Sequence, residues 1–464
     1  MKKGTKLIMA AALASVMALG AACQQSAPVS APSASPSESA APSPSAPAAP
    51  SPSPSPSAPA AKIHLTFWDE NADPNRSPIL QDIIGSFNSS QDKISVEYVG
   101  VPQTDVQDKY NVAITAGETP DIGGLQGQWL SGYVIRGAVI PLDDYFNAWD
   151  KKGDMTPSAI QSVRDIVPDG KLYMIPDSLN TACAWYRTDL FKAAGVAIPK
   201  TWDEFFAAAD KLTDKANNKY GFTMRGGSGG ATTFIEILYN FAGNTVFDSS
   251  GKCTINSPAN IDFTTKYFGM YGKNTPESDI TAAWKEMAAN FDGGTSAMLI
   301  HNLGSYKNHM DAFKDQSKFE ADPLPVSQNG NHNMSESVIG YMIFKNSKNP
   351  DAAWEFLKYF MNEQNNSKWN KAIGQLPVNT KVMSEDWVKQ APHINTMLAA
   401  LNDPATTTMG LPFYLPDYAS IASKTIEPAI QEVMTGKMSA KDMLDLWADQ
   451  LNKSKADYDK NVAK

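Results

Sequence analysis

The segment from residue 24 to 61 constrains this chain most, because it cannot form a packed core. It reads QQSAPVSAPSASPSESAAPSPSAPAAPSPSPSPSAPAA, with 11 of the chain's 31 prolines, a single charged residue (Glu38), and no aromatic residue or glycine. With so little apolar surface to bury, such a tract is expected to stay disordered. Its prolines favour an extended chain of about 3.1 Å per residue, which gives a reach on the order of 100 Å. The foldable part of the sequence therefore runs from about 62 to 464.

Residues 1–22 have the composition of a secretory signal peptide. Three lysines precede an apolar stretch at 7–19, and small residues lead to Cys23. The run LGAAC at 19–23 resembles the lipobox of bacterial lipoproteins, although Gly20 stands where the commonest pattern has leucine. The resemblance implies that Cys23 is lipidated and becomes the mature N-terminus, holding the protein on the membrane surface. With the long tether, we expect a lipid anchor on the extracellular face of a Gram-positive cell membrane.

The charge balance excludes one class of partner. The chain has 40 Lys+Arg against 49 Asp+Glu, a formal charge of -9, and removing the three signal-peptide lysines leaves -9 - 3 = -12. Nucleic-acid binding requires a basic face, so an acidic chain disfavours it. A composition of 42% hydrophobic and 19% charged residues is typical of a soluble globular protein. The length suits two or three units, each with its own core.

Strand and helix patterns alternate at the start of the foldable part. Strand patterns at 63–68 and 94–99 are followed by helical spacing at 79–88 and 105–116. This alternation predicts an α/β fold with a mainly parallel sheet. The C-terminal third is mostly helical in pattern, with helices expected at 351–361, 421–434 and 439–456.

Eight short motifs follow one another in an order that is recognisable. They include DGKLYMIP at 169–176, KTWDEF at 200–205 and the run KNSKNPDAAWEFL at 345–357. The others lie at 119–122, 137–143, 185–191, 291–300 and 375–378. The set resembles the sugar-binding branch of bacterial extracellular solute-binding proteins, the receptors of ABC importers, which includes maltose-binding protein. The matches cover nearly all of 62–464.

The resemblance implies an α/β fold of the periplasmic-binding-protein kind, with two lobes, an interlobe hinge and a ligand cleft. It assigns 62–180 and 300–343 to the first lobe. It assigns 181–299 and 346–464 to the second, whose last helices could lean back on the first. Closure around the ligand follows if the ligand contacts both lobes only in the closed state. The implied function is capture of a carbohydrate, most simply an oligosaccharide, for delivery to the membrane permease subunits, by a monomer without cofactor.

Candidate binding residues follow from where strands end, and further strands are expected at 172–176 and 297–300. Open α/β sheets bind ligands beyond the carboxyl ends of their strands, and a sugar needs aromatic faces together with amide, carboxylate or guanidinium groups. The residues that meet these conditions, or that match ligand-contacting segments of the family, are Trp68, Asn71, Asp73, Gln126, Gln128, Trp129, Asn180, Arg225, His301, Asn302, Gly340, Tyr341, Phe413 and Tyr414. For 68–73 the alternative is a helix-capping loop, and for 126–129 a plain surface loop. Trp202 and Trp354 lie in helical patterns, so we assign both to packing.

Catalytic and metal sites lack a matching pattern. The five histidines form no HExxH motif, and the loop at 69–80 has no glutamate at the twelfth position of a calcium loop. The run GGSGG at 226–230 fits the spacing of a hydrolase elbow but is not preceded by a buried apolar strand. We therefore expect a binding protein and not an enzyme, with no metal. A secreted carbohydrate-active enzyme and an adhesin or sensor domain remain the alternatives. Cys183 and Cys253 could form a disulfide or stay two buried thiols.

Overall fold

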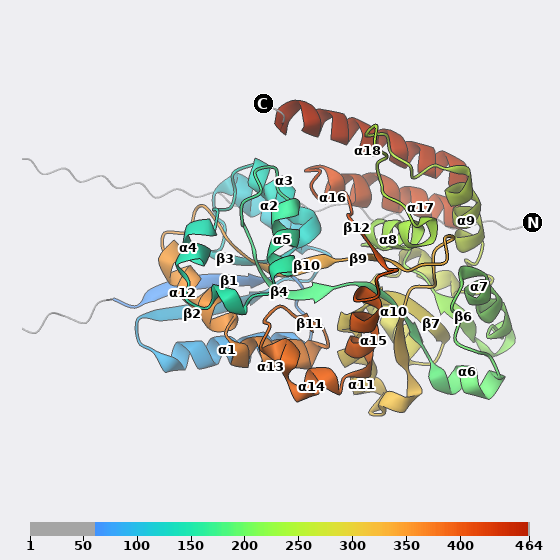
Figure 1. Ribbon diagram of the computed structural model, residues 1–464, viewed down its shortest axis with the longest axis horizontal. Coiled ribbons are helices and arrows are strands. Elements are labelled where there is room, and N and C mark those ends of the chain that lie inside the picture. Colours follow the sequence, from blue (N-terminus) through green and yellow to red (C-terminus); the bar gives the residue numbers. More distant parts are fainter. Residues whose placement is uncertain (1–60, 463–464) are drawn as a thin grey trace, which may run out of the picture. The chain divides into compact units, whose positions relative to one another are not determined.

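The computed structural model describes residues 61–462 and contains two main sheets (Figure 1). The expected signal peptide, the lipidation site at Cys23 and residues 24–60 of the Pro/Ser/Ala tract lie outside these residues. The first sheet has the strand order β11-β4-β10-β3-β1-β2. Its strands are β1 (Ile63–Asp69), β2 (Ile94–Gly100), β3 (Ile122–Gln126), β4 (Ile175–Asn180), β10 (Ser337–Ile343) and β11 (Leu376–Pro377).

Helices from two distant parts of the sequence cover the first sheet (Figure 1). β1 alternates between buried and more exposed residues, with Leu65, Phe67 and Asp69 on its buried side. β4 is buried along its whole length, as expected for a strand covered on both faces. The helices of this region are α1 (Ser77–Ser90), α2 (Val106–Ala116), α3 (Gly127–Ile135), α4 (Asp143–Ala148), α5 (Pro157–Asp165), α12 (Pro350–Phe360), α13 (Glu363–Ile373) and α14 (Asp386–Lys389).

The second sheet has the order β6-β7-β5-β8. The chain enters it at the junction of β4 and β5, where only Thr181 separates the two strands. Its strands are β5 (Ala182–Tyr186), β6 (Tyr220–Thr223), β7 (Ser296–Asn302) and β8 (Glu320–Pro323), and its helices include α6 (Thr188–Ala194), α7 (Trp202–Lys211), α8 (Gly230–Ala242), α9 (Pro258–Phe268), α10 (Trp284–Asp292), α11 (Tyr306–Phe313) and α15 (Pro392–Leu401). β9 (Asn333–Ser335) and β12 (Thr407–Met409) form a separate parallel pair.

The C-terminal helices follow the predicted spacing, with one change of winding. The helix expected at 421–434 is a π-helix over Ile421–Ile426, here labelled η7, and continues as α17 (Glu427–Met434). α16 (Tyr418–Ser420) precedes it and contacts α3 of the first region. The long helix α18 (Ala440–Val462) ends the described chain. Among residues 61–462, none of the helices combines the length and apolar character needed to cross a membrane.

Two expectations about the strands are wrong. The sheets are mixed and not mainly parallel: β1 runs parallel to β2 and β3, but β10 is antiparallel to both β3 and β4. The reason is that the chain crosses from one region to the other and back. A strand that re-enters a sheet after such a crossing, as β10 does, runs opposite to the strands already there. The strand expected at 172–176 begins only at Ile175, because 171–173 form an irregular segment that leads into β4.

The division between the two regions also differs from the expected one. β7 and β8 pair with β5 in the second sheet, so 300–302 and 320–323 do not belong with the first. α12 contacts β1 and β10, and α13 contacts α1 and β11, so these helices pack on the first sheet and not the second. We therefore use "first lobe" for the sheet of β1 with α1–α5 and α12–α14. "Second lobe" denotes the sheet of β5 with α6–α11, α15, η7, α17 and α18.

Buried side chains agree with the packing predictions. Trp202 and Trp354 are both buried in the hydrophobic core, as predicted from their helical spacing. Cys183 lies in β5 and Cys253 in the loop before α9, and both are buried free thiols. Of the two alternatives for this pair, the structure therefore has two separate thiols.

Candidate ligand-binding cleft

A cavity of about 150 Å³ lies between the two lobes, beside the point where β4 passes into β5. The parallel strands β1 and β3 end at its first-lobe wall, and the start of β10 lines it from the same side. The end of β7 contributes from the second lobe. Because carboxyl ends of neighbouring strands meet at one edge of a sheet, polar loop residues that are distant in sequence converge here.

Nine of the fourteen predicted site residues line this cavity. They are Asn71, Asp73, Gln126, Gln128, Asn180, Arg225, His301, Asn302 and Phe413. The other five, Trp68, Trp129, Gly340, Tyr341 and Tyr414, are not among its lining residues. Asn180 is the last residue of β4 and not a residue of a loop after it.

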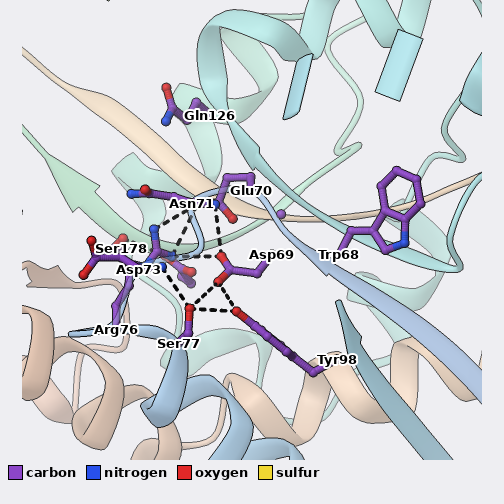
Figure 2. A network of polar contacts seen from close by, with 12 residues as sticks. Trp68, Asp69, Glu70, Asn71, Asp73, Arg76, Ser77, Tyr98, Gln126 and Ser178 are labelled. Atoms are coloured by element: carbon purple, nitrogen blue, oxygen red, sulfur yellow. Dashed lines mark hydrogen bonds and ion pairs between the residues drawn. The ribbon is translucent and has the colours of Figure 1, made fainter. Parts of the chain in front are cut away.

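Strand geometry explains why Trp68 is excluded. Successive side chains of a strand point to opposite faces of the sheet, so Trp68 and Asp69 point to different faces, and neither lines the cavity beyond the end of the strand. The Trp68 ring stacks on Tyr110 with centroids 5.6 Å apart, and Lys109 Nζ lies 4.3 Å from its centre. Figure 2 shows the ring directed away from the polar network.

The other four predicted residues stay out of the cavity for separate reasons. Tyr341 is 1% exposed, and its ring packs on Phe67 at a centroid distance of 5.2 Å. Gly340 lies against β4 so closely that a Cβ would collide with the Ile175 carbonyl oxygen. The Tyr414 ring packs edge-on against Tyr458, with centroids 5.1 Å apart. Trp129 lines a neighbouring cavity instead.

The first-lobe wall is built on a buried network of charges in the loop between β1 and α1 (Figure 2). The Asp69 carboxylate accepts hydrogen bonds from the Tyr98 hydroxyl at 2.7 Å and from the Asn71 backbone N–H at 3.1 Å. Arg76 donates to Glu70 Oε1 at 3.3 Å, and its Nη2 lies 3.6 Å from Asp69. These contacts fix the loop so that Glu70, Asn71 and Asp73 all line the cavity.

Burial controls the charge of this wall. Burial raises the pKa of Glu70 to about 7, with the nearby Arg76 opposing the shift and Asp69 adding to it. Burial also raises the pKa of Asp177, which lies behind the wall, to about 6. Glu70 was not predicted from the sequence, although it stands between the predicted Trp68 and Asn71.

Several buried polar atoms at the cavity have no hydrogen-bond partner among the described residues. They include Glu70 Oε2, Asn71 Oδ1, Gln103 Oε1 and both polar atoms of the Asn180 amide. Asn180 is 2% exposed. Buried polar groups are normally paired, so a set of unpaired donors and acceptors around one cavity indicates a polar ligand.

The second-lobe wall presents an aromatic face. Trp284, the first residue of α10, lines the cavity and stacks on His301 with centroids 5.9 Å apart and planes 9° apart. His301 Nδ1 lies 2.6 Å from Ser305 Oγ. Burial lowers the pKa of His301 to about 3, with Arg225 adding to the shift, so the imidazole is neutral at pH 7. Sequence reasoning missed Trp284 because it begins a helix and follows no strand.

Arg225 and Glu236 complete this wall. Arg225 Nε donates to the Ser228 carbonyl at 2.6 Å, Nη1 donates to Thr233 Oγ1 at 3.3 Å, and Nη2 has no partner among the described residues. Burial lowers the pKa of Arg225 to about 10. Burial raises the pKa of Glu236 to about 7, although Ser335 Oγ donates to it at 3.3 Å. Within residues 61–462, neither side chain has an ion-pair partner within 4.0 Å.

Polar contacts join the lobes across the cavity. Lys285 Nζ of α10 lies 3.3 Å from Asp73 of the first lobe. Asn75 donates to the Asn308 side-chain oxygen at 3.4 Å. In the part of the chain that the structure describes, no three histidine, cysteine or acidic side chains cluster as metal ligands would. The arrangement suits reversible enclosure of a polar molecule.

Comparison with known proteins agrees with this arrangement. A putative binding protein of Brucella abortus is 25% identical over 82% of this chain and 90% of its own length. The arabinooligosaccharide-binding protein of Bacillus subtilis is 24% identical over 71% of this chain and 77% of its own length. In fold, the chain matches the GacH receptor of Streptomyces glaucescens with a TM-score of 0.74, at 21% identity over 85% of this chain and 98% of that one.

Maltose-bound MalE3 of T. maritima matches with a TM-score of 0.73, at 22% identity over 84% of this chain and 99% of that one. The two-lobe solute-receptor fold expected from the sequence is therefore confirmed. The model of the family described as bacterial extracellular solute-binding protein matches residues 72–367. These residues include large parts of both lobes and most of the residues that line the cleft, and the chain belongs to the bacterial extracellular solute-binding protein family.

Proposed function

We propose that this protein is the carbohydrate receptor of an ABC importer. It encloses a sugar between its lobes and delivers it, chemically unchanged, to the permease subunits in the membrane. The observation that carries the proposal is the pairing of the Trp284 face with the unpaired amide and carboxyl groups of Asn71, Asn180 and Glu70 around one cavity. A pyranose needs an apolar face for its C–H groups and a rim of donors and acceptors for its hydroxyls.

The charges of the cleft favour a neutral ligand. Most charged lining residues already have ion-pair partners: Glu70 pairs with Arg76, Asp73 with Lys285 and Lys307 with Asp311. An anionic or cationic solute would place an uncompensated charge in a buried site, which costs free energy. The name of the Bacillus subtilis relative, an arabinooligosaccharide-binding protein, and that of a 23% identical maltotriose-binding protein of Pyrococcus abyssi support a saccharide.

The proposal includes the remaining expectations from the sequence. Asn71, Asp73, Gln126, Gln128, Asn180, Arg225, His301, Asn302 and Phe413 contact the sugar, together with Glu70 and Trp284. The protein acts as a monomer without cofactor, anchored by a lipid at Cys23 on the outer face of the membrane. It has no catalytic role, and the cross-lobe contacts of Asp73 and Asn75 hold the closed form.

Calorimetric titration of the full chain with neutral mono- and oligosaccharides, followed by recovery of the ligand, tests the proposal. Saturable binding with intact sugar recovered is the expected result. Cleavage of a bound sugar would instead establish the carbohydrate-active enzyme, and the absence of binding across a broad panel would reject carbohydrate as the solute. Mass spectrometry of the mature protein tests lipidation at Cys23, for which an unmodified cysteine is the contrary result.

A further inference from the structure

We infer that Asp279 is a positioning residue for the ligand site, because it fixes Arg225 and Trp284, two cavity-lining groups of the second-lobe wall, relative to one another. The inference rests on the proposed function, since it assumes that these two side chains bind the sugar. Asp279 lies in the 3-10 helix η3 (Glu277–Thr281) and is fully buried. It is not among the residues that line the cavity, so it acts through others.

The carboxylate of Asp279 holds the end of β6, directly before Arg225. It accepts a hydrogen bond from the Met224 backbone N–H at 2.7 Å. The Thr223 hydroxyl also donates to it, with Oγ1 3.1 and 3.0 Å from the two carboxylate oxygens. Thr223 is the last residue of β6, and Met224 precedes Arg225 in the chain. The Asp279 side chain therefore sets the direction in which the chain leaves the strand and carries Arg225.

The same carboxylate holds α10, the helix that begins with Trp284. Asn290 of this helix donates from its side-chain amide to Asp279 Oδ1 at 3.1 Å and to Thr223 Oγ1 at 3.2 Å. One buried acid is thus bound both to the strand end that leads to Arg225 and to the helix that carries Trp284. A change at Asp279 should release both groups together.

The GGSGG run at 226–230 brings the two segments into backbone contact. The Gly226 N–H donates to the Asp279 carbonyl oxygen at 3.1 Å, and the Gly227 N–H donates to the Ala282 carbonyl oxygen at 2.9 Å, two residues before α10 begins. A Cβ at position 226 would lie 2.5 Å from the Asp279 carbonyl oxygen, and one at 227 would collide with the backbone of η3. Glycine is therefore required where the two backbones approach this closely.

The carboxyl group of Asp279 is kept at a cost to stability. Burial raises its pKa to about 7, with the hydrogen bonds from Met224, Thr223 and Asn290 opposing the shift. These donors are neutral, so they fix the directions of the two segments but compensate only part of the cost of burying the acid. Proteins accept such local costs chiefly at functional sites, where a fixed geometry is needed.

Fluorine NMR of the full chain labelled with fluorotryptophan tests the inference without a ligand. Trp284→Phe identifies the Trp284 resonance among those of the ten tryptophans. Asp279→Asn keeps the size of the side chain but replaces one acceptor oxygen by a donor, which opposes the Met224 and Thr223 donors. Gly226→Ala disturbs the same contact from the other segment, through the collision of its Cβ with the Asp279 carbonyl oxygen.

Two matched controls leave this contact unchanged. Asp292→Asn alters the last residue of α10, which pairs with the buried His309 at 2.6 Å and does not line the cavity. Gly153→Ala adds a Cβ in open space between α4 and α5. Each variant is also unfolded in urea and titrated with the sugar that the wild type binds best.

We expect Asp279→Asn and Gly226→Ala to shift or broaden the Trp284 resonance and to weaken sugar binding by about fivefold or more, because a site depends on the precise placement of its groups. Both controls should leave the resonance in place and the affinity within about twofold. The urea midpoint of Asp279→Asn should fall no further than that of Asp292→Asn. In the double variant Asp279→Asn/Trp284→Ala, the loss of affinity should be smaller than the product of the two single losses.

An unmoved Trp284 resonance in both Asp279→Asn and Gly226→Ala would overturn the inference and leave the sugar-receptor function intact. Losses of affinity that multiply in the double variant would overturn it as well, because Asp279 would then act independently of Trp284. Absence of sugar binding by the wild type would reject the proposed function, and the resonance would still decide whether Asp279 fixes Trp284.

Discussion

The two walls of the cleft differ in the side-chain chemistry that they present to a ligand. The first-lobe wall is a network of buried charges in which Arg76 is shared between Glu70 and Asp69. The second-lobe wall is an aromatic and imidazole face, Trp284 on a neutral His301, with Arg225 and Glu236 left without ion pairs among the described residues. The first wall is therefore held in place by its own contacts, whereas the second leaves more donors and acceptors free for a ligand.

The largest expected effect is on the stability of the first wall. Arg76→Ala leaves Glu70 and Asp69 buried without their cation, and breaking a buried pair in this way costs about 3–5 kcal/mol in the free energy of unfolding. Urea denaturation measures it. Arg164→Ala is the control, because its pair with Asp143 is only partly buried and should cost about 1 kcal/mol or less. Equal losses in the two variants would contradict the charge-network description of this wall.

The next effect is on ligand affinity at the second wall. Trp284→Ala should weaken sugar binding by at least tenfold, because it removes an apolar face worth about 1.5–3 kcal/mol when buried. Calorimetry with the best ligand of the panel measures the change. Trp68→Phe should leave the affinity within twofold, since Trp68 stacks on Tyr110 outside the cavity. The reverse ranking would restore the sequence-based choice of Trp68 as the platform.

The pH dependence of stability tests the buried carboxyl group of the second wall. Burial raises the pKa of Glu236 from its ordinary 4.5 to about 7, against the opposing effects of Ser335 and Arg225. Below pH 4.5 the carboxyl is protonated in both folded and unfolded chains, so its contribution to stability is fully present. As pH rises toward 7, the unfolded chain ionises first and this contribution is lost.

The unfolding free energy of the wild type should therefore fall between pH 5 and 8 relative to that of Glu236→Gln, by about 1–3 kcal/mol. Urea denaturation at four pH values measures the difference between the two proteins. Parallel pH profiles would show that Glu236 does not titrate in this range.

The smallest effect concerns the contact between the walls. Lys285→Ala removes the ion pair with Asp73. Because the lysine side chain is 44% exposed, the binding free energy should fall by only about 0.2–1 kcal/mol. We expect up to about a fivefold loss of affinity at low salt and a smaller loss at 0.5 M NaCl. Lys266→Ala breaks a pair within the second lobe and should not change affinity. A salt-independent loss would point to packing by the lysine stem instead.

The lobe assignment shows where the sequence was insufficient. Helical spacing at 351–361 correctly predicted α12, and the burial of Trp354 followed from it. Spacing along one helix does not say which sheet its apolar side covers, and α12 packs on β1 and β10. In the same way, the strand pattern at 297–300 predicted β7 but not its pairing with β5. Pairing and packing partners depend on contacts between segments that are distant in the chain.

The sequence by itself determined the family, the strand and helix patterns, and nine residues that line the cleft, because motifs and strand ends are local features. The tertiary structure decided which side chains face the cavity. It packed Trp68 on Tyr110 outside the cavity, buried Tyr341 in the core, and brought Glu70, Glu236 and Trp284 to the cleft from three separate segments. The physical reason is that side-chain direction depends on strand parity, and burial and pKa depend on the packing of both lobes.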